Sequence, residues 1–72
     1  MDLIEKLDQL RLNDLDYISI KVFNKKGYWH KYLSGFYKQL KKKIHKNDSL
    51  VFKEMHIENG IYKIEVLDPL YK

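Results

Sequence analysis

Lysines are the side chains best placed to do chemistry in this chain, and they crowd into its middle. Residues 21–46 carry nine lysines and no acid, whereas residues 1–20 have a net charge of −3 and residues 47–72 a net charge of −2. An even distribution would place several acids in the middle, so residues 21–46, called the basic segment below, predict a separate electropositive surface. Lysine offers a mobile point charge suited to phosphate, and each neutralised phosphate releases counterions.

Three interpretations of the basic segment compete: nucleic-acid contact, an acidic protein partner, or a face that is merely solvated. No Glu–Lys pair at i,i+4 spacing offsets the repulsion among its lysines, which favours nucleic acid. Base-edge recognition prefers Arg, Asn and Gln, which are scarce in the segment, so we expect phosphate contacts with modest base reading. The residues predicted to bind nucleic acid, two of them from a C-terminal hairpin, are Lys25, Lys26, Lys31, Ser34, Lys38, Lys41, Lys42, His45, Lys46, His56 and Lys63.

Aromatic residues are interleaved with these lysines and allow two interpretations. Tyr28, Trp29, Tyr32, Phe36 and Tyr37 could stack on single-stranded bases. At helical spacing, however, Trp29 and Phe36 are predicted to lie in the core, which leaves only Tyr28 and Tyr37 near the edge of the basic face. Stacking is therefore the less favoured interpretation.

The sequence provides little for catalysis or metal binding. His30, His45 and His56 lack the spacing of metal ligands, there is no cysteine, and the glycines form no phosphate-cradling loop. Asp14 and Asp16 are predicted to cap neighbouring elements rather than to hold a cation. No Ser–His–Asp partnership can be proposed, and a chain of 72 residues rarely builds a catalytic cleft. We expect no enzyme, no cofactor and no metal.

Hydrophobic spacing predicts the elements that position the basic segment. Residues 1–12 have a helical period, and residues 17–23 alternate as a strand. Residues 28–46 return to a helical period in which Ser34-Gly35 is a weak point, so they form either one long helix or two joined helices. The stripe that supports this helix consists of Trp29, Leu33, Phe36, Leu40 and Ile44.

A β-hairpin is predicted for the C-terminal part. Residues 50–57 and 61–67 are rich in β-formers, and Asn59-Gly60 between them favours a type I′ turn. Such a turn pairs Ile57 with Tyr62, Met55 with Ile64, Lys53 with Val66, His56 with Lys63 and Glu54 with Glu65. Asn47-Asp48 is expected to end the preceding helix, and residues 70–72 to form a short tail.

The expected fold is one small α+β domain that covers residues 1–72. The order of helix, strand, basic helical segment and hairpin resembles a winged-helix domain, which implies a recognition helix in the major groove and the hairpin as a wing. The competing arrangement is a three-stranded antiparallel sheet with two helices on one face.

The expected function is non-enzymatic binding of nucleic acid, with DNA favoured over RNA, by an accessory protein or a regulator of transcription or replication. The alternative is an interaction module or inhibitor that docks its basic face or a sheet edge onto an acidic site of a larger enzyme. Residues with AT-rich codons number 35, which is typical of a phage, plasmid or other mobile element. The acidic N-terminus and the lack of a long apolar run predict a cytoplasmic protein without a membrane span. Homodimerisation would add burial to a small core.

Overall fold

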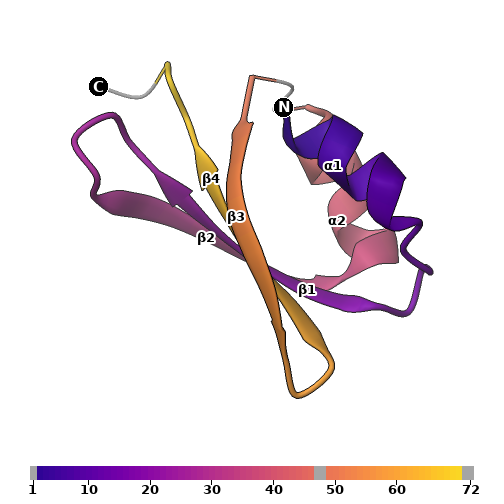
Figure 1. Cartoon of the computed structure of the whole chain (residues 1–72). Helices are drawn as coiled ribbons and strands as arrows, with labels where there is room; N and C mark the ends of the chain where they lie inside the picture. Colours follow the sequence, from indigo (N-terminus) through magenta and orange to yellow (C-terminus); the bar gives the residue numbers. More distant parts are fainter. Residues whose placement is uncertain (1, 47–48, 71–72) are drawn as a thin grey trace.

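Four strands form one mixed sheet, and two helices cover one of its faces (Figure 1). The computed structural model describes residues 2–46 and 49–70. Along the chain the elements are α1 (Leu3–Leu10), β1 (Tyr17–Phe23), β2 (Trp29–Phe36), α2 (Tyr37–His45), β3 (Val51–Glu58) and β4 (Ile61–Leu67). The strand order is β2-β1-β4-β3; the two outer pairs are antiparallel and the central β1–β4 pair is parallel.

The protein is α+β, but both predicted layouts were wrong. The winged-helix layout fails because residues 28–46 are not helical throughout: residues 29–36 form strand β2, and the helix spans only Tyr37–His45. The three-stranded alternative fails because β2 makes a fourth strand and the central pair is parallel. Trp29, Leu33 and Phe36 have helical spacing in the sequence, yet in the strand Leu33 packs against the core while the two aromatics are exposed.

Alternation along the two central strands builds the core, as expected for residues 17–23. Ile18, Ile20 and Val22 of β1 are buried beneath the helices, and Ile64 and Val66 lie beside them on β4. Fully burying such a side chain stabilises the fold by roughly 1.5–3 kcal/mol. The helices complete the core with Leu3, Leu7, Tyr37, Leu40 and Ile44.

The C-terminal hairpin has the predicted turn and most of the predicted register. Asn59 and Gly60 have φ values of 51° and 75°, as a type I′ turn requires. All the predicted pairs form except Lys53 with Val66, because a bulge between Phe52 and Glu54 brings Phe52 opposite Val66 instead. A bulge adds one unpaired residue and bends the strand that carries it.

Two of the sequence predictions concern residues that the structure does not describe. The helix stop expected at Asn47-Asp48 lies outside the described residues, as do the last two residues of the expected tail. Within residues 2–46 and 49–70, no helix has the length and apolar character needed to cross a membrane.

Gly35 allows β2 to run directly into α2, and its replacement tests this junction. Its φ is +147°, a value that side chains disfavour, and an added Cβ would lie 3.2 Å from Oε1 of Gln39. We expect Gly35→Ala to lower the free energy of unfolding by about 1–3 kcal/mol, measured by urea denaturation. Gly27→Ala is the control, because Gly27 also has a positive φ but nothing within 4 Å. Equal destabilisation of the two variants would contradict the steric part of this explanation.

Candidate nucleic-acid interface

The structure distributes the predicted binding residues over several parts of the molecule. Lys38, Lys41, Lys42, His45 and Lys46 remain together on α2 and at its C-terminal end. The others separate: Lys25 and Lys26 lie in the β1–β2 turn, Lys31 and Ser34 lie on β2, and His56 and Lys63 face each other across β3 and β4. One continuous helical ridge is therefore not formed, because β2 replaces half of the predicted helix.

A compact basic surface does remain on α2, and we call Lys38, Lys42, His45 and Lys46 the helix surface. All four residues are exposed, and at about 100° per residue they fall within about 100° of the helix circumference. Lys38, Lys42 and Lys46 follow one another about one turn, or ~6 Å, apart. Among the residues that the structure describes, no carboxylate forms an ion pair with these three lysines.

Packing rather than local sequence holds α2 in place. The helix has no acid in its first turn and no side-chain cap, and the i,i+4 lysine pairs repel one another. Its first N–H groups are instead satisfied by the loop before β1: Tyr37 donates to the carbonyl of Asp16 at 2.8 Å, and Lys38 donates to that of Asp14 at 3.1 Å. On the other side, Leu40 and Ile44 are buried in the core. Packing against the sheet thus stabilises α2 although its lysines repel one another.

Lys41 is turned away from the helix surface by a partner that the sequence did not reveal. Its Nζ lies 3.2 Å from Oδ1 of Asp14 and 4.9 Å from the centre of the Tyr37 ring. Both charged side chains are about half exposed, so the ion pair contributes little to stability. It nevertheless neutralises one of the lysines predicted to contact phosphate.

A second surface lies on the open face, the face of the sheet opposite the helices. Register places Phe36 opposite Tyr17, Tyr32 opposite Lys21 and Trp29 opposite Phe23. Trp29, Tyr32 and Phe36 are 59%, 49% and 43% exposed, so the prediction that Trp29 and Phe36 lie in the core was wrong. We call the following residues the hairpin surface: Tyr17, Lys21, Trp29, Tyr32 and Phe36.

Contacts between side chains orient the rings of the hairpin surface. The hydroxyl of Tyr32 lies 2.5 Å from Oγ of Ser19 in a hydrogen bond, so the ring extends across the sheet from β2 to β1. The rings of Tyr17 and Phe36 meet edge to face, with centroids 5.5 Å apart. Such contacts keep the rings in place, and each of the three rings still exposes more than a third of its residue surface.

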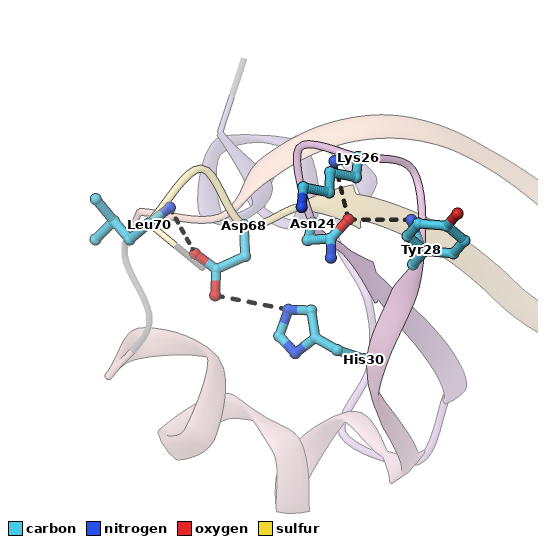
Figure 2. A network of polar contacts seen from close by, with 6 residues as sticks. All are labelled: Asn24, Lys26, Tyr28, His30, Asp68 and Leu70. Carbon is cyan, nitrogen blue, oxygen red and sulfur yellow. Dashed lines mark hydrogen bonds and ion pairs between the residues drawn. The ribbon is translucent and has the colours of Figure 1, made fainter. Parts of the chain in front are cut away.

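The β1–β2 turn is ordered around Asn24 (Figure 2). The side-chain oxygen of Asn24 accepts hydrogen bonds from the N–H groups of Lys26 at 2.9 Å and Tyr28 at 3.1 Å. Below the turn, His30 points toward Asp68, with 3.9 Å between Nε2 and Oδ2, and Asp68 donates its own N–H to the carbonyl of Phe23. The Asn24 contacts order the backbone of the turn, and the contacts of Asp68 connect the hairpin to the end of β4.

The half of the open face formed by β3 and β4 carries acidic as well as basic side chains. A hollow of about 240 Å³ separates the two halves and is lined by Ser19, Lys21, Tyr32, His56, Lys63, Ile64 and Glu65. Two of its lining residues, Lys63 and His56, also approach Glu58 at 3.3 Å and 3.6 Å.

The hydrogen bond and the charge of Lys63 lower the pKa of Glu58, so this ion pair stabilises the fold above the ordinary carboxyl pKa and is lost as the pH falls through the lowered value. Two predicted phosphate ligands, His56 and Lys63, are thus already close to a carboxylate.

Comparison with known proteins adds no relative to this geometry. No family model matches the sequence, and no curated protein or solved structure is significantly similar to it. Within the described part of the chain, no cluster of three or more His, Asp or Glu side chains could hold a metal ion.

Proposed function

We propose that this domain binds nucleic acid without catalysing a reaction, and that the helix surface holds the phosphates. The observation that carries the proposal is the row of Lys38, Lys42 and Lys46 on α2, exposed and without an ion pair among the described residues. A lysine row of this kind neutralises successive phosphates and releases their counterions. Lys25, Lys26 and Lys31 of the β1–β2 hairpin add positive charge, since no acid occurs anywhere in the basic segment.

The simplest opposing view is that these lysines are only solvated. Their spacing argues against it, because lysines one turn apart repel each other and lower the stability of a short helix. Asp14 pairs with Lys41, whereas Lys38, Lys42 and Lys46 form no ion pair with any carboxylate in the described part of the chain. The charge is thus concentrated on the exposed side of α2, where it is available to a polyanion.

The proposal predicts a steep dependence of affinity on salt. Fluorescence anisotropy with labelled DNA and RNA should give a log–log slope of about −2 to −3 between about 50 and about 200 mM salt, as expected for three or four phosphate contacts. Poly-L-glutamate of the same total charge is the matched competitor, because it offers the acidity of a protein partner without phosphate. Weak competition supports nucleic acid as the ligand.

Two results would contradict the proposal. Absence of binding to any nucleic acid at about 50 mM salt would show that the helix surface does not serve this purpose. Displacement by poly-L-glutamate at equal charge would show a surface that accepts acidic proteins equally well.

A further inference from the structure

We infer that the hairpin surface binds unpaired bases, so that the ligand of this domain is single-stranded nucleic acid. The inference rests on the proposed function and names its substrate class. It starts from the exposure of Trp29, Tyr32 and Phe36, three large aromatic side chains on one edge strand of an uncovered sheet face. Base–aromatic stacking is the main sequence-tolerant interaction by which proteins bind single strands, because every base has a π-face.

Charge complementarity identifies the occupant of this aromatic face. The β1–β2 hairpin contains no acid, so Lys21 on the open face and Lys25 and Lys26 in the turn add positive charge beside the exposed rings, while Glu65 lies opposite Lys21 on β4. An apolar protein partner would have to bury these lysines without neutralising them, which is costly. A second copy of this chain would bring the same positive charge against itself. A polyanion with flat apolar groups satisfies both the lysines and the rings.

The geometry also favours unpaired over paired bases. Side chains on one face of a strand are about 6.6 Å apart for every second residue, so Tyr32 and Phe36 lie ~13 Å apart on β2 and would contact different bases. In a duplex the faces of the bases are covered by their neighbours, and a sheet cannot stack on them. Bases that are splayed out from a single strand can lie on successive rings.

One nucleic-acid strand can contact both the hairpin surface and the helix surface. β2 is an edge strand, and Phe36 at its end precedes α2 directly. Lys38 is therefore two residues from Phe36. A nucleic-acid strand that passes over the edge of the sheet at Phe36 meets Lys38, the first lysine of the helix surface. Bases on the open face and phosphates beside α2 can thus belong to one continuous ligand.

The only tryptophan of the chain, Trp29, reports on stacking directly. Saturating oligo(dT) or oligo(U) of about 16 nucleotides should quench its fluorescence, whereas a blunt DNA duplex should leave it nearly unchanged. Anisotropy in the same buffer should show at least about tenfold tighter binding of the single strands than of the duplex. The DNA and RNA arms distinguish the two sources of single strands.

Ring removal provides the second measurement. Tyr32→Leu with Phe36→Leu should weaken single-strand binding roughly 5- to 150-fold per ring lost and leave duplex binding within about twofold. The conservative comparison is Phe36→Tyr alone, which keeps both rings and the hydrogen bond between Tyr32 and Ser19 and should recover most of the affinity that the leucine variant loses. Circular dichroism confirms that the variants are folded.

The outcomes separate this inference from the proposed function. Equal or tighter binding of duplex, or no quenching of Trp29 by saturating oligo(dT), overturns the single-strand assignment and leaves the phosphate-binding proposal intact. Quenching is measured on the unmodified chain, so it decides the question even where a variant fails to fold. Absence of binding to every nucleic acid overturns both proposals together.

Discussion

Reversing the charge of Lys38 and Lys42 together is expected to weaken nucleic-acid binding at least about 100-fold at about 50 mM salt. The two side chains lie one helical turn apart on the exposed side of α2, so Lys38→Glu with Lys42→Glu removes two phosphate contacts and adds two carboxylates where phosphates would lie. Each lysine that contacts a phosphate contributes about one unit to the salt dependence. The log–log slope of affinity against salt should therefore become shallower by about two units. Anisotropy titrations at several salt concentrations measure both quantities.

The control must change the net charge equally on another part of the molecule. Lys6→Glu with Arg11→Glu meets this condition. Lys6 belongs to α1, and Arg11 is the residue directly after the last residue of α1. If binding depends only on total charge, both double variants will bind equally weakly. A large effect at the helix surface and a small one beside α1 is the expected result, and the reverse order would assign the interface to α1.

Shortening Ile44 to alanine is expected to cause the largest loss of stability among these substitutions. Ile44 is 1% exposed and anchors the last turn of α2 in the core. A helix of nine residues is too short to persist in water without such packing. A buried Ile→Ala change costs about 2–5 kcal/mol, which in a domain of this size lowers the melting temperature by roughly 10–30 °C. Thermal unfolding followed by circular dichroism measures this shift.

Ile44→Val distinguishes lost packing from a general effect of substitution. It keeps a β-branched side chain and removes one methylene, for which about 0.5–1.5 kcal/mol is expected. Because the helix surface depends on α2, Ile44→Ala should also lose nucleic-acid affinity near its melting temperature, while Ile44→Val should retain it. A fully stable Ile44→Ala variant would show that α2 is not held by this side chain.

Elements defined by short-range chemistry could be predicted from the sequence. The N-terminal helix, the alternating strand at residues 17–23 and the Asn59-Gly60 hairpin all follow from spacing and turn preference, and the structure confirms them. β2 could not be predicted in this way, because an edge strand with apolar side chains on both faces has no clear alternation. Tyr32 and Phe36 on one face and Leu33 on the other produced a spacing that matches a helix as well as a strand.

Long-range pairing decided the rest of the fold and divided the predicted site. The parallel register of Ile20 with Ile64 joins segments that are far apart in the sequence, and no local pattern encodes it. The sequence shows that residues 21–46 are rich in lysine. Which of these lysines lie on α2 and which on the β1–β2 hairpin depends on where β2 ends, and the sequence pattern does not show that. The ion pair of Lys41 with Asp14 likewise depended on the loop before β1 being folded beneath α2.

The central position of β4 has a consequence for synthesis on the ribosome. This strand is made after the other five elements, yet it lies between β1 and β3 and supplies Ile64 and Val66 to the middle of the core. A nascent chain that has not reached β4 therefore has the β1–β2 hairpin and a β3 segment without its neighbouring strand, and the hairpin lacks the central strand beside β1. Cooperative folding must therefore wait until β4 has been synthesised and can join the earlier elements.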